Sequence, residues 1–195
     1  MRRVAAERLR QQGQPIGDVY LDREEIAARV AELGTAIAAA YAGRLLLLVA
    51  PLKSSAMFLA DLSRALPLEH ELDVIELASY GSGRPGGGVR LTKDLDAPIA
   101  GRDVLLVEDV VDTGLTLGFL TRCFAERGPA SLAAVTLLDR PHRRLVDDIP
   151  LDYVGFTVPD ELFAGYGLGL DERWRALPDL HLVIADELPA AIDAA

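Results

Sequence analysis

The stretch that decides the fold is residues 103–116, which read Asp-Val-Leu-Leu-Val-Glu-Asp-Val-Val-Asp-Thr-Gly-Leu-Thr. Its first part, Asp103 to Val107, is a short apolar run typical of a strand that is covered on both faces. The next segments predict a helix over Leu117 to Arg127, a stop at Gly128-Pro129 and a second strand over Leu132 to Leu138. A strand, a helix and a strand form a βαβ unit, so we expect the two strands to lie parallel in one sheet.

The same alternation of helix and strand extends toward the N-terminus. Asp22 and Glu25 have the spacing of a capping box, and apolar residues then recur at helical spacing up to Ala42. The pattern next predicts a strand over Leu45 to Ala50, a helix that Ser54 and Ser55 can cap and that ends at Pro67, and a strand over Leu72 to Ser79. We therefore expect an α/β fold, a mainly parallel twisted sheet flanked by helices.

Length and charge narrow the classes of protein. A chain of 195 residues suits one domain, and 20 basic against 30 acidic side chains give a net charge of −10. Nucleic acids and anionic membranes attract positive surfaces, so we expect neither as a partner.

The cysteine content and the apolar segments indicate a cytoplasmic protein. Cys123 is the only cysteine, which excludes an internal disulfide, and its apolar neighbours predict a buried helix residue. Residues 1–12 do not have the pattern of a secretory signal. The longest apolar block, Leu45 to Leu52, is far shorter than the ~20 residues that span a bilayer.

The chemistry is expected between Glu108 and Thr116, where a strand meets a helix. Ligands of open α/β sheets bind beyond the carboxyl ends of the strands. Glu108 and Asp109 could accept hydrogen bonds from a vicinal diol or hold hydrated Mg²⁺. Residues 113–116, Thr-Gly-Leu-Thr, offer helix-end amides and two hydroxyls to a phosphate. The combination indicates a ribose 5-phosphate ligand, whereas an isolated Asp112-Thr113 pair would only cap the helix.

The run over Glu108 to Thr116 resembles the 5-phosphoribosyl 1-pyrophosphate (PRPP) signature of the phosphoribosyltransferases. From about Val19 to Val183, the chain looks like the hypoxanthine-guanine branch of the type I family. The segments that match in order are 51–58 (Pro-Leu-Lys-Ser-Ser-Ala-Met-Phe), 79–81 (Ser-Tyr-Gly), 137–141 (Leu-Leu-Asp-Arg-Pro), 153–161 (Tyr-Val-Gly-Phe-Thr-Val-Pro-Asp-Glu), 165–168 (Gly-Tyr-Gly-Leu) and 173–178 (Arg-Trp-Arg-Ala-Leu-Pro).

The resemblance implies a single domain with a small hood. The core would cover about 35–150 and the hood about 1–20 and 155–185, with a flexible tail over 188–195. By composition the glycine-rich segment from Tyr80 to Gly88 is an exposed, mobile loop, either a passive hairpin tip or a lid that closes over the ligand. Its start, 79–81, resembles the flexible catalytic loop of the family, which implies the lid. The family usually forms dimers or tetramers, so we expect a homodimer or a homotetramer.

The implied reaction transfers 5-phosphoribosyl from PRPP to hypoxanthine or guanine and forms IMP or GMP with release of pyrophosphate. Asp112 would exchange a proton with N7 of the purine. PRPP would be bound by Glu108, Asp109, Asp112, Thr113, Gly114, Leu115, Thr116, Lys53, Ser54, Tyr80 and Arg175, and the base by Arg140, Leu162 and Phe163. Mg²⁺ would be the cofactor, with Glu108 and Asp109 as its ligands.

The sequence departs from the family pattern in four places. Arg140 replaces a lysine that reaches the purine 6-oxo group, Leu162 an aromatic residue that stacks on the base, Gly169 a metal-binding aspartate and Ser54 a glycine. These departures keep two alternatives open. One is a phosphoribosyltransferase for a modified or non-standard nucleobase, and the other is a regulatory protein that binds PRPP or a nucleotide without turnover.

Overall fold

The computed structural model describes residues 14–80, 88–146, 148–170 and 172–184. They divide into two compact units. The larger unit is Arg29–Asp160, and the smaller one takes the described residues up to Ala28 and from Glu161 onward. In the described part of the chain, no helix is both long and apolar enough to cross a membrane.

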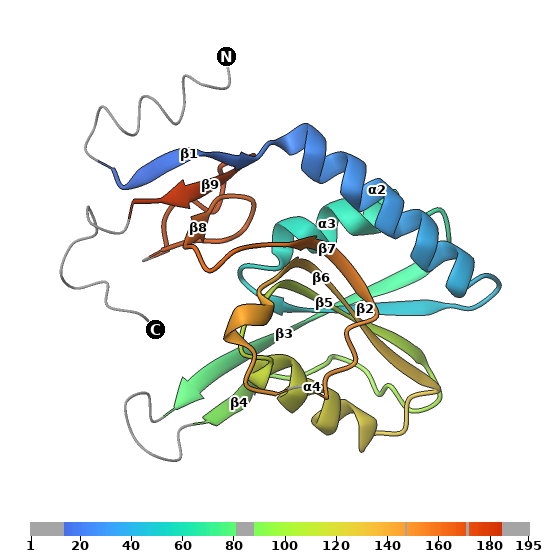
Figure 1. Ribbon diagram of the computed structural model, residues 1–195. Helices are drawn as coiled ribbons and strands as arrows, with labels where there is room; N and C mark the ends of the chain where they lie inside the picture. The colour runs from blue at the N-terminus through green and yellow to red at the C-terminus, as the bar shows by residue number, and fades with distance from the viewer. Residues whose placement is uncertain (1–13, 81–87, 147, 171, 185–195) are drawn as a thin grey trace. The chain divides into compact units, whose positions relative to one another are not determined.

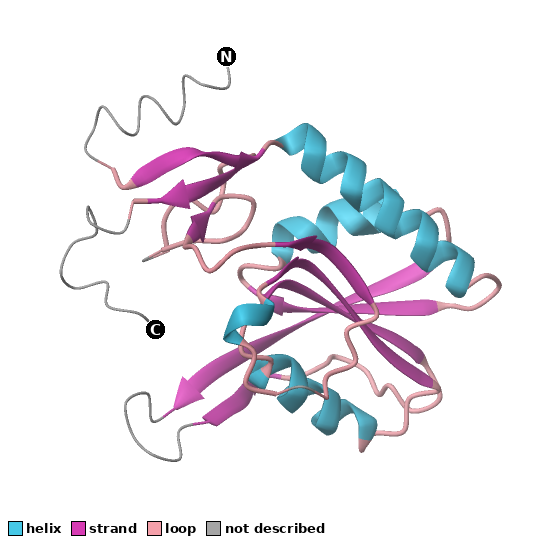
Figure 2. Ribbon diagram, in the orientation of Figure 1, coloured by secondary structure: helices cyan, strands magenta, loops and turns pink. Residues whose placement is uncertain are grey.

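The larger unit is built on a six-stranded sheet with the order β4-β3-β2-β5-β6-β7. All neighbours are parallel except β4, which pairs antiparallel with β3 at one edge. Helices α3 and α4 lie on opposite faces of this sheet (Figures 1 and 2). The strands are β2 (Leu46–Leu52), β3 (His70–Tyr80), β4 (Gly88–Lys93), β5 (Asp103–Val111), β6 (Ser131–Asp139) and β7 (Tyr153–Thr157), and the helices are α2 (Arg23–Ala40), α3 (Ala56–Ala65), α4 (Leu115–Ala125) and the 3-10 turn η1 (Pro141–Arg143). The expected α/β fold with a mainly parallel sheet is confirmed.

The core of this unit lies where the apolar strands β2 and β5 pair. Residues 46–50 and 104–107 are buried on both faces of the sheet, as their unbroken apolar runs predict. Leu117, Leu120 and Phe124 of α4 pack on one face. Cys123 contacts this core but is only half-buried, not buried as expected.

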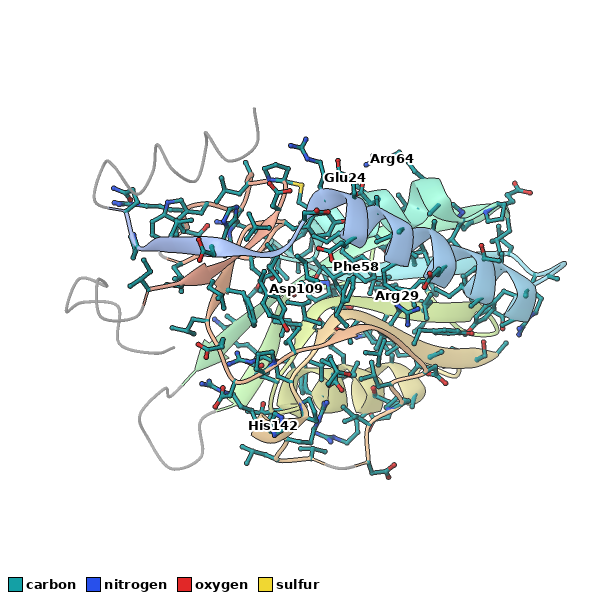
Figure 3. The ribbon with its side chains drawn as sticks, turned by 45° about the horizontal axis from the view of Figure 1, so that its top comes forward. Glu24, Arg29, Phe58, Arg64, Asp109 and His142 are labelled. Atoms are coloured by element: carbon teal, nitrogen blue, oxygen red, sulfur yellow. The ribbon has the colours of Figure 1, made fainter. Side chains whose placement is uncertain are left out.

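The start of α2 is the capping box that the sequence predicts. Asp22 Oδ1 accepts the backbone N–H groups of Glu24 and Glu25 at 2.9 Å, and the Glu25 carboxylate accepts the Asp22 N–H at 2.9 Å. Farther along α2, Arg29 donates to the carbonyl oxygens of Val154 and Gly155 at 2.8 Å (Figure 3).

Several boundaries differ from the prediction, among them α2, which ends at Ala40, and β2, which runs from Leu46 to Leu52. Two of the differences lie beside the acids. Strand β5 continues through the acidic residues to Val111, because Val110 and Val111 still pair with β6. Helix α4 begins at Leu115 and ends at Ala125, two residues before the expected bounds at each end.

The smaller unit contains a three-stranded antiparallel sheet with the order β1-β9-β8. Its strands are β1 (Ile16–Leu21), β8 (Phe163–Ala164) and β9 (Leu180–Val183). The sheet brings together segments from the two ends of the chain, and Ile16, Ala164 and Val183 form its buried core. The expected tail over 188–195 lies outside the described residues.

Candidate active site

Two adjacent carboxylates lie near the carboxyl end of β5, in the middle of the larger sheet. Glu108 and Asp109 are only 5% and 7% exposed, because β2 and β6 flank β5. Successive side chains of a strand point to opposite faces, so the two carboxylates face away from each other across the sheet. Asp109 lies on the face covered by α3, the helix that carries Phe58 (Figure 3).

Burial governs the proton affinity of both acids. Burial, and then the neighbouring charge of Asp109, raise the pKa of Glu108 well above its ordinary value. Burial also raises the pKa of Asp109, but hydrogen bonds from Ser54 and Ser55 oppose that rise. The Ser55 Oγ atom donates to Asp109 Oδ1 at 3.2 Å. Hydrogen bonds therefore stabilise the ionised form of Asp109, and this sets it apart from Glu108.

The serine turn between β2 and α3 therefore has a different role from the one predicted. Ser55 occupies the N-cap position of α3 but makes no side-chain cap hydrogen bond. Its hydroxyl is directed to Asp109 instead. The predicted cap was wrong, because the rotamer that lets the hydroxyl donate to the buried Asp109 carboxylate does not bring its oxygen to the amides of α3. Lys53, after a cis Leu52–Lys53 peptide bond, is exposed at the same sheet edge as the acids, since β2 and β5 are parallel neighbours.

The acid pair fits a magnesium ion in its chemistry. Mg²⁺ is usually held by one or two carboxylates together with water and substrate phosphates, so a full protein cage is not needed. Among the described residues, Glu108 Oε1 is buried without a hydrogen-bond partner, and no cluster of three or more metal-ligating side chains occurs. A cation at this place would satisfy that oxygen and favour the ionised form of Glu108.

The turn after β5 presents backbone amides. Gly114 precedes α4 with φ +80°, a left-handed conformation that suits glycine. The Thr113 hydroxyl accepts the Leu115 N–H at 3.3 Å, so the first amide of α4 already has a partner. The turn is fixed through the Thr113 carbonyl oxygen, which accepts the N–H groups of Leu145 and Val146 at 2.9 and 3.2 Å. The other amides of the first turn of α4 belong to a helix N-terminus, the kind of place where anions bind in proteins. Thr116 lies in this first turn.

Asp112 and Arg140, two residues predicted for the site, contact each other. Arg140 follows β6 and is 6% exposed, and its Nη1 atom lies 3.2 Å from the Asp112 carboxylate. Its Nη2 atom donates to Asp160 at 2.7 Å. Asp160 is not among the site residues predicted from the sequence. Asp160 lies in the segment 153–161, which resembles the family, and this was the available sequence signal. Its contact with Arg140 becomes visible only in the folded chain.

The other predicted residues belong to the smaller unit. Phe163 is buried, with its ring centroid 4.9 Å from that of Tyr20, and Leu162 packs on the core around Ile16. The Arg175 Nη1 atom donates to the Gly167 carbonyl oxygen at 2.9 Å.

Arg175 also explains the glycine at position 169. A Cβ on Gly169 would lie 2.7 Å from the Arg173 carbonyl oxygen and 2.8 Å from Arg175 Cγ, so an aspartate does not fit this arrangement. Tyr80 ends β3, but its side chain and the predicted loop over 81–87 lie outside the described residues.

A model of the phosphoribosyl transferase domain matches residues 17–173. The hypoxanthine phosphoribosyltransferase of Salmonella typhimurium is 45% identical over 174 residues, which cover 87% of this chain and 97% of that protein. The hypoxanthine-guanine phosphoribosyltransferase of Mycobacterium avium is 47% identical over 169 residues, 83% of each chain.

Solved structures agree with these relatives. A hypoxanthine-guanine phosphoribosyltransferase from Bacillus anthracis superposes with a TM-score of 0.81 at 39% identity, covering 86% of this chain and 99% of that one. The Trypanosoma cruzi hypoxanthine phosphoribosyltransferase in complex with its product IMP gives a TM-score of 0.82 at 37% identity, covering 88% and 96%. This chain therefore belongs to the phosphoribosyltransferase family, in its hypoxanthine-guanine branch.

Proposed function

We propose that this protein transfers the 5-phosphoribosyl group of PRPP to hypoxanthine or guanine, forming IMP or GMP and pyrophosphate in purine salvage. One observation carries the proposal: the buried Glu108–Asp109 pair is followed directly by the turn at Gly114 and the N-terminus of α4. Acids beside a phosphate-binding helix end suit a ribose 5-phosphate group better than either feature alone.

This geometry supports the following binding roles. Thr113, Gly114, Leu115 and Thr116 hold the 5-phosphate, while Glu108 and Asp109 accept hydrogen bonds from the ribose hydroxyls. Mg²⁺ held by one of the two acids, Glu108 or Asp109, would supply positive charge against the pyrophosphate. Lys53, Ser54, Tyr80 and Arg175 are proposed as further PRPP contacts.

Asp112 is proposed as the residue that moves the proton. The bond between ribose C1 and the pyrophosphate oxygen breaks, the bond from C1 to purine N9 forms, and the N7 proton passes to Asp112. Arg140 can donate to the 6-oxo oxygen of the base while it remains beside Asp112. Leu162 and Phe163 are proposed to contact the base.

A pyrophosphate-release assay across nucleobases tests the proposal. Wild-type protein with PRPP and Mg²⁺ should act on hypoxanthine or guanine in preference to adenine and to modified purines. A clear preference for a modified base would replace the proposed acceptor. PRPP binding by calorimetry without pyrophosphate release from any base would instead identify a regulatory binding protein.

Asp112→Asn isolates the proton step. Asparagine keeps the shape but cannot accept the proton, so kcat should fall about 100-fold or more, with PRPP affinity within about twofold of wild type. Asp94→Asn is the matched control, since Asp94 is also bound by an arginine, Arg127, but lies outside the candidate site. Equal kcat values for the two variants would remove Asp112 from the mechanism.

We also propose that the smaller unit acts as the hood and that the protein is a cytoplasmic homodimer or homotetramer. Sedimentation equilibrium of the purified chain measures the oligomeric state.

A further inference from the structure

Arg140 lies in a chain of alternating charges at one edge of the larger sheet. Its Nη1 atom is 3.2 Å from Asp112 and its Nη2 atom is 2.7 Å from Asp160. Asp160 also accepts a hydrogen bond from Nε of Arg143. The Arg140 side chain is 7% exposed, whereas that of Asp160 is 51% exposed. Asp160 is thus a half-exposed carboxylate that pairs with a buried guanidinium.

The fold brings these residues together from three neighbouring strands. Asp112 follows β5, Arg140 follows β6 and Asp160 lies three residues beyond the end of β7, and the three strands are parallel neighbours. Their carboxyl ends therefore meet at one edge. Two carboxylates, one on each side, hold the planar guanidinium at two separate nitrogens. With Asp112 alone, the guanidinium could still turn about that contact.

The charge on Asp160 is maintained from its other side. The hydrogen bond from Arg143, and then that from Arg140, lower the pKa of the Asp160 carboxyl below its ordinary value. Asp160 is therefore ionised at neutral pH. Arg143 lies in the turn η1 next to Arg140. Its backbone N–H donates to the Arg140 carbonyl oxygen at 3.1 Å.

A guanidinium held in this way still has hydrogens to donate. Nη1 and Nη2 each carry a second N–H, and Nε is buried with no hydrogen-bond partner among the described residues. Such a donor set suits an oxo group on a heterocycle and opposes an amino group, which also donates. Discrimination of this kind depends on donors whose direction is fixed.

We propose that Asp160 is a positioning residue that acts through Arg140: it fixes the guanidinium beside Asp112 and so sets the preference for a 6-oxopurine over a 6-aminopurine. The inference rests on the proposed function for the identity of the base. Asp160 itself contacts Arg140 and Arg143 and is not proposed to contact the base.

Asp160→Asn tests this role, with Asp94→Asn as its matched control. The two aspartates are both 51% exposed and both bound by an arginine, but Asp94 pairs with Arg127 outside the site. Asp160→Asn should raise KM for hypoxanthine about fivefold and reduce the preference for hypoxanthine over adenine, because one charged anchor of Arg140 is weakened. KM for PRPP should stay within about twofold. Equal base KM values for the two variants would overturn the proposal.

A double-mutant cycle separates positioning from general structure. In an Arg140→Lys background, Asp160→Asn should add no further loss, because lysine lacks the fork that Asp160 orients. Full additivity would contradict action through Arg140. Asp160→Glu, which keeps the charge, should recover most of the wild-type KM. An Asp160→Asn protein that melts well below Asp94→Asn would mark Asp160 as structural and also overturn the proposal.

Calorimetry with IMP keeps the test separate from the proposed reaction. Asp160→Asn should bind IMP about fivefold more weakly than Asp94→Asn, whether or not the protein turns over. A wild-type protein that forms no nucleotide would overturn the proposed function alone. Equal IMP affinities in the two variants would overturn the role of Asp160 alone.

Discussion

At the scale of single residues, Glu108 is a group whose ionisation in the folded, unliganded protein costs free energy. Its carboxyl is buried, Oε1 has no hydrogen-bond partner among the described residues, and Asp109 is its neighbour. The unliganded protein can avoid a buried, unpaired charge by keeping Glu108 protonated, which is the physical meaning of its raised pKa. The arrangement becomes favourable only when a hydroxyl or a cation meets that oxygen.

Glu108 should make the unliganded protein less stable as the pH rises. The folded state holds the proton more tightly than the unfolded chain, whose pKa is near 4.5, so the free energy of unfolding falls as the pH rises above that value toward the raised folded pKa. Glu108→Gln should flatten this slope and stabilise the protein at neutral pH by about 1–3 kcal/mol. Thermal melts from pH 5 to 8 in chelator measure the effect.

The control for this prediction is Glu76→Gln in β3, where the side chain is exposed. It should follow the wild-type pH dependence. If Glu108→Gln also follows the wild type over the whole range, then Glu108 does not bind its proton in the folded state.

The residue scale also shows where sequence reasoning ends. The order of Glu108, Asp109, Asp112 and Thr113 predicts acids followed by a helix end, and the structure has that order within 103–125. It could not predict that Ser55 donates to Asp109, 54 positions away, or that Asp160 holds Arg140 from another strand. Both contacts depend on which strands are neighbours, and local periodicity carries no such information.

At the scale of elements, the patterns predicted which segments form helices and strands better than where they end. The capping box fixes the start of α2 because its donors and acceptors are only three residues apart. The end of β5 depends instead on pairing with β6, so the strand runs through polar residues that resemble a loop in the sequence. Boundaries set by a partner element are not readable from one segment.

Two glycines inside helices allow a test of helix packing. A Cβ on Gly34 of α2 would lie 2.6 Å from the Ala65 carbonyl oxygen at the end of α3, so only glycine permits this approach. A Cβ on Gly118 of α4 would have its nearest neighbour at 3.5 Å, an ordinary contact. Gly34→Ala should therefore destabilise the protein by about 1–3 kcal/mol, although alanine favours helix.

Gly118→Ala is the matched control for Gly34→Ala. With no clash to offset the better helix propensity, it should be neutral or stabilising by up to about 1 kcal/mol. Urea denaturation of both variants gives the comparison. Equal free energies of unfolding would show that α2 and α3 do not approach each other as closely as described.

At the scale of the whole molecule, the net charge of −10 must be reconciled with a strongly anionic ligand. The charge of the chain as a whole repels a polyanion over its length, but such repulsion is screened within about a Debye length, ~8 Å at physiological salt. A small phosphate ester meets only local groups. In the candidate site these are amides of α4, the exposed Lys53 and acids that suit a cation, so the net charge opposes long polyanions and is compatible with PRPP and Mg²⁺.

Thermal melts can test this distinction, because a ligand that binds only the folded state raises its stability by mass action. PRPP with Mg²⁺ at about 100 times its Kd should add roughly 2.7 kcal/mol, or about 5–10 °C in Tm for a chain of this size. PRPP in chelator should give a smaller shift, and Asp109→Asn should reduce the part that depends on Mg²⁺, because that carboxylate is the one the serines support. Heparin at equal phosphate or sulfate concentration should give no shift, since its charges need an extended positive surface. A heparin shift as large as that of PRPP with Mg²⁺ would mean that general anion binding, and not the acid pair with the α4 amides, selects the ligand.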